Sequence, residues 1–173
     1  VSRVADRLIC ISRAARNDVA AQIELNSSDK TWTPRLGWFH LGADIKNTSP
    51  SVHLPRDADD FFGRIVNQIT FLMVGTVEPR KGHALVLDAF SQLWRDGYDF
   101  NLVVIGKKGW LVDDLADRMR ACSKNGSKFY WFQGASDEFL ERAYLSCSCL
   151  LAASEAEGFG LPLIEASFHN LPV

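Results

Sequence analysis

The chain beyond residue 68 alternates between short apolar runs and longer amphipathic stretches. The runs "ITFLMVG" and "FNLVVIG" are continuously apolar, whereas "KGHALVLDAFSQLWRDG" between them spaces its apolar residues at helical intervals. Continuous apolar runs predict buried strands, and the helical spacing predicts a helix that stops at Gly97. The alternation continues as helix, strand, helix and strand in "LVDDLADRMRACSKNG", "FYWFQG", "SDEFLERAYLSC" and "CLLAAS".

This alternation predicts the fold class. Buried strands that are separated by helices pair in parallel, with helices on both faces of the sheet. We therefore predict an α/β protein with a doubly wound, Rossmann-like parallel sheet. Ligands of such sheets bind at the carboxyl ends of the strands, so the loops that follow the strands are the places where chemistry is expected.

The first 45 residues have a separate pattern. The strand-like run "DRLICIS" leads into a helical stretch with Ser12 as its N-cap, and the strand-like run "LGWFHLGADI" follows. Residues 46–66 mix Pro, Ser, Asp and Asn, which predicts a connection between domains. We therefore expect the end of one domain over 1–45, this connection, and a Rossmann-like domain over 67–173. Because the sequence begins with Val and ends in "HNLPV", which looks like the start of a strand, we expect an excised fragment with an incomplete last domain.

Composition and charge exclude several classes of function. The 19 Lys and Arg residues nearly balance 21 Asp and Glu residues, so no overall field favours nucleic acid or an anionic membrane. The apolar stretches are of strand length, which predicts neither a transmembrane helix nor a signal peptide. The four cysteines form no CxxC pair, and no HExxH motif or Cys/His cluster occurs. We expect reduced thiols, no metal ligands and a cytoplasmic protein.

The stretch "VGTVEPRKGH", residues 74–83, lies where a strand ends and a helix begins. Gly75 permits a tight turn, Pro79 stiffens it, and Arg80 and Lys81 place two cations where the free N–H groups of a helix start already favour an anion. A phosphate or diphosphate would fit there. The stretch is not a P-loop, because that motif requires glycine where Arg80 stands. A solvated basic turn is the alternative interpretation.

The stretch "AEGFGLPLIEA", residues 156–166, combines two carboxylates with two glycines. A helix that begins near Leu161 places Glu165 roughly one turn in, whereas Glu157 stays in the preceding loop. Glycines let the backbone approach a ligand, and the amides of Phe159, Gly160 and Leu161 would point outward. Carboxylates accept pairs of hydroxyl hydrogen bonds, so two of them beside an anion site suit a sugar nucleotide. The alternative is a solvated helix face and an acid that is favoured by the helix dipole.

These two motifs carry a family resemblance. "SEAEGFGLPLIEA" resembles the E-x7-E signature of the retaining glycosyltransferases of family 4, which have the GT-B fold, and "VGTVEPRKG" is similar to their diphosphate-binding turn. "ADRLICISRAARNDV" and "HLGAD" resemble the end of the family's amino-terminal domain. The resemblance covers nearly the whole chain. It implies the carboxyl-terminal half of a GT-B protein, which binds the nucleotide sugar, with a remnant of the acceptor-side domain.

Carried over by position, the resemblance implies roles for four charged residues. Arg80 and Lys81 would hold the donor diphosphate, Glu165 would bond the ribose hydroxyls, and Glu157 would contact the transferred sugar. Thr76 departs from the family pattern, since many members carry Arg directly after the turn glycine. The diphosphate charge would then rest on Arg80 and Lys81 alone.

Further donor contacts are expected from the loops at the strand ends. "GKKGWL" and "QGAS" would border the nucleobase. His40 resembles a position near the interdomain cleft, although a lone His between apolar neighbours is more often a packed residue, and His83 would touch phosphate. The expected donor-binding positions besides Glu165 are Gly75, Thr76, Gly134, Phe159, Gly160 and Leu161.

The resemblance implies a hexosyltransferase that uses a nucleoside diphosphate sugar. "GTVEPRKG" is similar to bacterial mannosyltransferases of surface polysaccharide assembly, which favours GDP-mannose as the donor and a glycan or lipid-linked glycan as the acceptor. We expect no cofactor and no metal, because two cations and helix amides supply the positive potential. A sugar-nucleotide-binding module without turnover, a GT-B epimerase, and peripheral association of the full-length protein with the inner membrane face stay open. The isolated fragment is expected to be inactive.

Overall fold

The computed structural model describes residues 5–26, 34–42, 50–124 and 128–173. The chain divides into two compact units. The first comprises Val1–Ile45 and Glu157–Gly160, and the second comprises Lys46–Ala156 and Leu161–Val173. Each unit has its own sheet, and each is described by itself.

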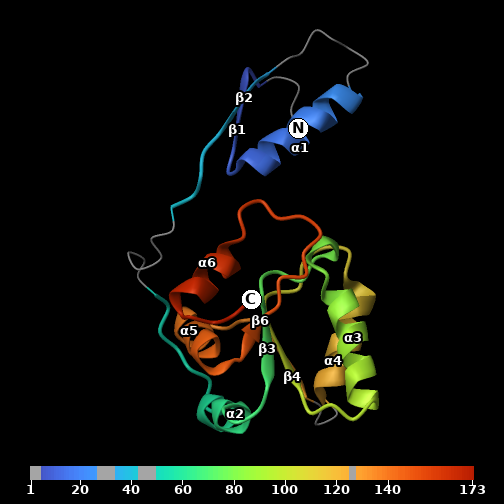
Figure 1. The fold of residues 1–173 in the computed structure, drawn as a ribbon, viewed down its shortest axis with the longest axis vertical. Coiled ribbons are helices and arrows are strands. Elements are labelled where there is room, and N and C mark those ends of the chain that lie inside the picture. Colours follow the sequence, from blue (N-terminus) through green and yellow to red (C-terminus); the bar gives the residue numbers. More distant parts are fainter. Residues whose placement is uncertain (1–4, 27–33, 43–49, 125–127) are drawn as a thin grey trace. The chain divides into compact units, whose positions relative to one another are not determined.

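The first unit contains one β-α-β arrangement (Figure 1). Strands β1 (Arg7–Cys10) and β2 (Arg35–Trp38) pair in parallel, and helix α1 (Arg13–Asn26) connects them. The Ser12 hydroxyl accepts a hydrogen bond from the backbone N–H of Ala15 at 3.1 Å, which confirms the predicted N-cap. The second strand-like run is strand only as far as Trp38, and its last residues lie outside the described part of the chain.

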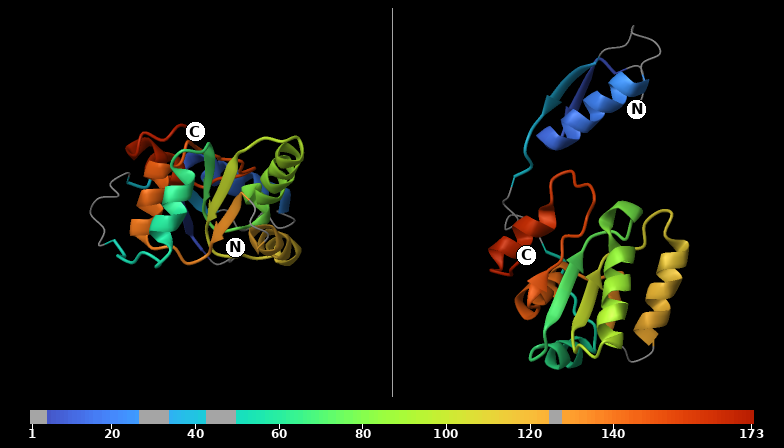
Figure 2. Two further views of the ribbon diagram at one scale, coloured as in Figure 1. Left: turned by 90° about the horizontal axis from the view of Figure 1, so that it is seen from below. Right: turned by 45° about the vertical axis from the view of Figure 1, so that its right-hand side comes forward.

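The second unit contains a four-stranded parallel sheet in the order β5-β4-β3-β6. Helices α3 and α4 cover one face, and helices α2, α5 and α6 cover the other (Figures 1 and 2). This arrangement is the predicted doubly wound α/β fold. The strands are β3 (Thr70–Val74), β4 (Asn101–Ile105), β5 (Phe129–Phe132) and β6 (Cys149–Leu150). The helices are α2 (Ala58–Ile65), α3 (His83–Arg95), α4 (Asp113–Lys124), α5 (Asp137–Ser146) and α6 (Leu161–Phe168), with a short 3-10 turn, η1, at Pro79–Lys81.

The apolar strands are buried because consecutive side chains enter different hydrophobic clusters. Leu72 and Val103 pack with the helices α2, α5 and α6, whereas Met73 and Val104 pack with α3 and α4. All four side chains are at most 4% exposed. A strand that is covered on both faces needs apolar residues at every position, which is why β3 and β4 could be recognised as continuous runs.

Helix α2 corrects the expectation of a connection over residues 46–66. Its apolar residues Ala58, Phe61, Phe62 and Ile65 follow helical spacing and are each at most 3% exposed. Asp59 and Asp60 in the first turn and Arg64 in the last suit the helix dipole. The preceding residues are rich in Pro, Ser, Asp and Asn, so the composition of residues 46–66 did not indicate this helix. The core of the second unit therefore begins before residue 67.

Candidate functional site

The basic turn begins where β3 ends, at the carboxyl edge of the sheet. Gly75 has a φ of +130°, and its N–H donates to the carbonyl of Ile105 at 2.9 Å. Val77 is fully buried and is bonded on both sides to the loop after β4, because its N–H donates to Lys107 O and its carbonyl accepts from Gly109 N–H, each at 2.9 Å. The turn is therefore held firmly against the neighbouring loop before it enters η1 and α3.

Two glycines that the sequence interpretation did not single out allow this close packing. A Cβ on Gly106 would lie 1.8 Å from the carbonyl oxygen of Gly75. A Cβ on Gly82, whose φ is +71°, would lie 2.2 Å from the carbonyl oxygen of Ala153. The only signal in the sequence is that Gly106 directly follows an apolar strand and Gly82 directly precedes a helix. Neither pattern identifies the carbonyl that approaches.

Arg80 connects the basic turn to the acidic motif. Its Nη1 donates to the carbonyl oxygen of Ala156 at 2.8 Å, and its own carbonyl accepts from the N–H of Glu155 at 2.9 Å. Its Nη2 also pairs with the Glu78 carboxylate at 3.0 Å. The side chain and the backbone of one residue thus hold the segment that leads into Glu157. This contact joins two motifs that are far apart in the sequence.

Lys81 lies over the beginning of the turn. A Cβ on Gly75 would be 3.8 Å from the Lys81 Nζ, so the ammonium group lies beside the glycine that directly follows β3. A side chain at Gly75 would reduce the space next to this cation. Gly75, Lys81 and the start of α3 therefore occupy one place at the carboxyl end of β3, as an anion site requires. Thr76 lies in the same turn and is exposed.

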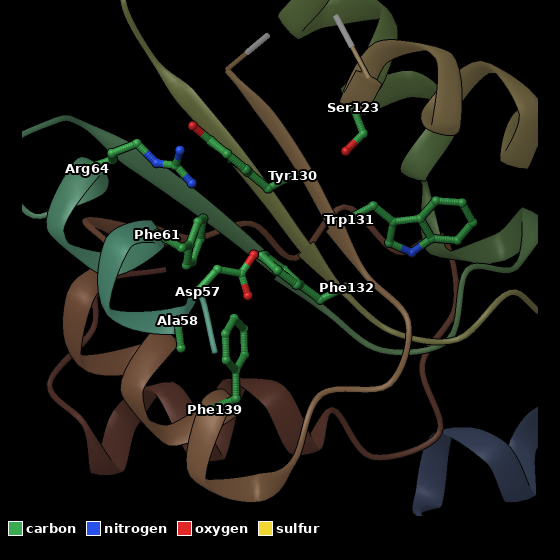
Figure 3. A pocket seen from close by; sticks show the side chains of 9 residues that line it. All are labelled: Asp57, Ala58, Phe61, Arg64, Ser123, Tyr130, Trp131, Phe132 and Phe139. Atoms are coloured by element: carbon green, nitrogen blue, oxygen red, sulfur yellow. The ribbon is translucent and has the colours of Figure 1, made fainter. Parts of the chain in front are cut away.

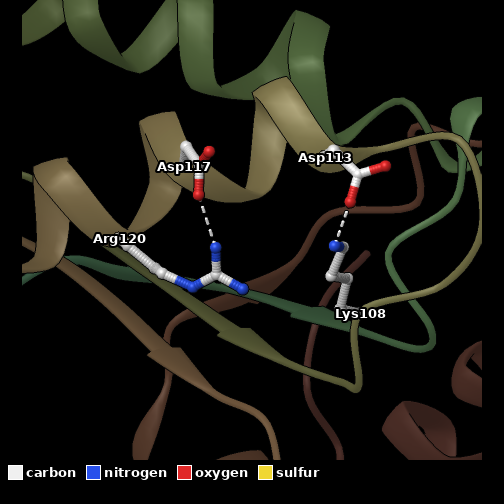
Figure 4. A network of polar contacts seen from close by, with 4 residues as sticks. All are labelled: Lys108, Asp113, Asp117 and Arg120. Carbon is white, nitrogen blue, oxygen red and sulfur yellow. Dashed lines mark hydrogen bonds and ion pairs between the residues drawn. The ribbon is translucent and has the colours of Figure 1, made fainter.

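The loop after β4 carries its own charge pair (Figure 4). The Lys108 ammonium donates to the carboxylate of Asp113 in the first turn of α4, and this hydrogen bond holds the pKa of Asp113 below its usual range. On the same helix Arg120 pairs with Asp117 at 2.6 Å. One of the two lysines in "GKKGWL", Lys108, is thus paired with a carboxylate on α4, and the expected place of this loop beside a nucleobase stays a prediction.

The acidic motif enters α6 as the spacing predicts. The helix begins at Leu161 after Gly160, whose φ is +82°, and Glu165 lies about one turn inside it. Glu165 is half-buried and accepts a hydrogen bond from the Tyr144 hydroxyl at 2.6 Å. Tyr144 was missed by the sequence interpretation, because nothing in "ERAYLSC" distinguishes this tyrosine from a core residue.

The loop before α6 belongs to the first unit. Glu157 in this loop is exposed, and Phe159 is half-buried. Within that unit the Phe159 ring lies 6.2 Å from the ring of His40, so the structure brings these two sequence candidates together. The predicted roles of the Glu157 carboxylate and of the loop amides stay predictions.

Gly134 follows the edge strand β5, so β4 lies between its strand and β3. It is exposed, and a Cβ there would meet no atom within 4 Å. Its backbone therefore has no close neighbour that demands glycine. The nucleobase contact that was expected from its place at the end of a strand stays a prediction.

His83 differs from the expectation that it would touch phosphate. Its ring shares the buried face of α3 with Val86, Leu87 and Phe90 and is 4% exposed. Neither ring nitrogen has a hydrogen-bond partner among the described residues. Burial, and then the positive charge of Lys81, lower the pKa of His83 to about 4. The residue is therefore a neutral, buried histidine at the start of α3, two residues after Lys81.

A separate hollow of about 130 Å³ lies beside β5 (Figure 3). Tyr130 and Phe132 line it from the strand, and Asp57 and Arg64 line it from the two ends of α2. It contains none of the residues that were predicted to bind the donor.

Among the described residues, no three His, Cys, Asp or Glu side chains lie together in an arrangement that could hold a metal ion. None of the helices in that part of the chain combines the length and the hydrophobicity of a membrane span.

The second unit is a doubly wound α/β domain with a basic turn directly after β3 and an acidic motif at the start of α6. The model of the family "glycosyl transferases group 1" matches residues 56–173, and the chain belongs to this family. The family resemblance deduced from the two motifs is thereby confirmed.

The relatives and the solved structures agree with this assignment. The serotype-specific mannosyltransferase WbdA of Escherichia coli is 46% identical over 98% of the chain, and the O-antigen chain mannosyltransferase B of Escherichia coli is 32% identical over 89%. The chain spans only 21% of WbdA and 43% of the second enzyme. Anabaena HepE, solved with UDP and glucose, matches 99% of the chain and 44% of its own at a TM-score of 0.62 and 20% identity. Trehalose-6-phosphate synthase OtsA matches 93% of the chain and 42% of its own at a TM-score of 0.65 and 14% identity, so the predicted GT-B type of fold is confirmed.

Proposed function

We propose that this chain is the donor-binding part of a retaining hexosyltransferase. In this proposal it binds GDP-mannose and transfers the mannosyl group to a growing glycan or lipid-linked glycan. The observation that carries the proposal is the bond from Arg80 to the carbonyl of Ala156, because it fixes the cationic turn to the residue that directly precedes the E-x7-E motif. The names of the two relatives support mannose as the sugar and a polysaccharide as the acceptor.

The chain's own residues would act mainly by electrostatics. Lys81 and the amides at the start of α3 would stabilise the diphosphate as it leaves with its additional negative charge. Arg80 would have two roles: its charge would stabilise the same anion, and its bond to Ala156 would hold the segment that leads into Glu157. Glu165 would bind the ribose hydroxyls and Glu157 the transferred sugar. We further propose that the reaction needs no metal and takes place in the cytoplasm.

The proposed function is tested by calorimetric titration of the protein with GDP, UDP, ADP and dTDP and with their common sugar conjugates. We expect GDP-mannose to bind, and to bind equally well in EDTA, because the site supplies its own positive potential. Transfer of labelled mannose to a glycan acceptor by the full-length protein then tests turnover. Failure of every nucleotide sugar to bind would refute the proposal, and binding without transfer to any acceptor would favour a module without its own turnover.

The two acids are expected to differ in what they bind. Glu165→Gln should weaken binding of both GDP and GDP-mannose by about 1–3 kcal/mol, because ribose hydroxyls lose a charged acceptor. Glu157→Gln should weaken binding of GDP-mannose only. Glu155→Gln is the matched control, since this exposed neighbour contributes its backbone N–H to Arg80. The measurement is titration of each variant with both ligands, and wild-type affinities in both acid variants would contradict the assignments.

A further inference from the structure

Tyr144 donates a hydrogen bond to Glu165 from a neighbouring helix. The tyrosine lies in α5 and is 2% exposed, and its hydroxyl donates to Oε2 of Glu165 in α6 at 2.6 Å. Its ring also stacks on His169, with ring centroids 5.3 Å apart and planes 8° from parallel. A ring that is buried and stacked has little freedom, so the hydroxyl is a fixed point for the carboxylate.

A hydrogen bond from a rigidly held hydroxyl determines the orientation in which the carboxylate can bind a diol. Glu165 has two oxygens, and the tyrosine occupies part of the bonding capacity of only one of them. The hydrogen bond fixes the orientation of the carboxylate, so that Oε1 and the remaining lone pair of Oε2 stay available to the ligand in one direction. Without the Tyr144 hydroxyl, the Glu165 side chain would become ordered only when the ligand binds. The rotamer freedom that it loses on binding would then reduce the affinity.

The tyrosine stays a donor throughout the working pH range. Burial, and then the hydrogen bond to Glu165, raise the pKa of Tyr144 well above its usual range. The phenol therefore keeps its proton and cannot become a second negative charge beside the carboxylate.

We propose that Tyr144 is a positioning residue that orients Glu165 toward the ribose hydroxyls and so makes the site selective for ribonucleotides over dideoxyribonucleotides. This inference rests on the proposed function, in which Glu165 binds the ribose. The competing explanation is that Glu165 merely satisfies a buried hydroxyl. A purely structural contact would affect all nucleotides alike, whereas a positioning contact affects only those that carry the hydroxyl groups.

The test uses Tyr144→Phe in the protein with its full natural chain. This variant keeps the ring and its stacking on His169 and removes only the hydroxyl. GDP and 2′,3′-dideoxy-GDP are titrated into wild type, Tyr144→Phe, Glu165→Gln and the double variant, and UDP with its dideoxy analogue forms a second pair. The quantity compared is the ratio of the two dissociation constants within a pair.

We expect wild type to prefer GDP over dideoxy-GDP by about tenfold or more, which corresponds to at least one charge-assisted hydrogen bond. Tyr144→Phe should reduce this preference about 3- to 10-fold and leave dideoxy-GDP affinity unchanged. In the Glu165→Gln background the same change should have a much smaller effect. Tyr130→Phe, at a half-buried tyrosine that packs on Phe61, is the matched control and should keep the wild-type ratio.

The outcomes separate the inference from the proposed function. If wild type prefers GDP and Tyr144→Phe keeps that preference, Tyr144 has no positioning role, although the proposed function stands. If wild type binds neither GDP nor UDP, the proposed function fails and the inference fails with it. Tyr144→Met is a second variant that lacks the donor; it loses the stacking on His169, but methionine adapts to irregular cavities, and the ratio of the two dissociation constants is compared in the same way.

Discussion

Gly106→Ala is expected to lower the free energy of unfolding of the second unit by about 3–5 kcal/mol, in the range that only severe core defects reach. The added Cβ would lie 1.8 Å from the Gly75 carbonyl oxygen. That oxygen cannot withdraw easily, because the N–H of Gly75 is bonded to Ile105 and the N–H of Gly106 is bonded to Phe132, each at 2.9 Å. The clash must therefore separate β3 from β4 or break this part of the sheet. Urea denaturation that is followed by circular dichroism measures the loss.

The control for this prediction is Gly63→Ala. Gly63 lies inside α2 and is exposed, and a Cβ there would meet no atom within 4 Å. Alanine is favoured over glycine in a helix by roughly 0.5–1 kcal/mol, so this variant should be slightly more stable than wild type. Equal stability of the two alanine variants would show that β3 and β4 do not approach as closely as the structure has them.

Gly106 also illustrates what the sequence could predict. The apolar runs that contain β3 and β4 are recognisable because both faces of each strand are buried, and burial leaves a pattern at every position. The approach of Gly106 to Gly75 leaves no pattern, since it depends on which strands become neighbours. Sequence alone therefore indicated the strands, and the structure was needed to explain the glycine.

In the candidate site, too, local features could be predicted from the sequence, whereas contacts between distant segments could not. The basic turn and the helix that carries Glu165 were predicted at the ends of strands, because helix starts and glycine turns are local features. The partners were not predicted: Arg80 bonds to Ala156, and Tyr144 bonds to Glu165 from another helix. Contacts between distant segments depend on packing, which the sequence does not display.

Helix α2 was missed for another reason: its apolar spacing follows a polar, proline-containing stretch.

The stability of the second unit should fall in acid because of His83. The folded pKa of this residue is about 4, and its ordinary value is 6.5, so the unfolded chain binds more protons between these pH values. The free energy of unfolding therefore decreases as the pH falls from about 6.5 to about 4, by roughly 3 kcal/mol in total. Above pH 6.5 the imidazole is neutral in both states and contributes no slope.

His83→Leu is expected to remove this part of the pH dependence. Leucine fits the buried face of α3 and cannot take up a proton, so the variant should be more resistant to acid than wild type. Phe90→Leu, on the same buried face, is the control: it should lower stability at every pH and keep the wild-type slope. Urea denaturation at several pH values between 4 and 7 provides the comparison. If His83→Leu retains the wild-type slope, another group causes the acid sensitivity.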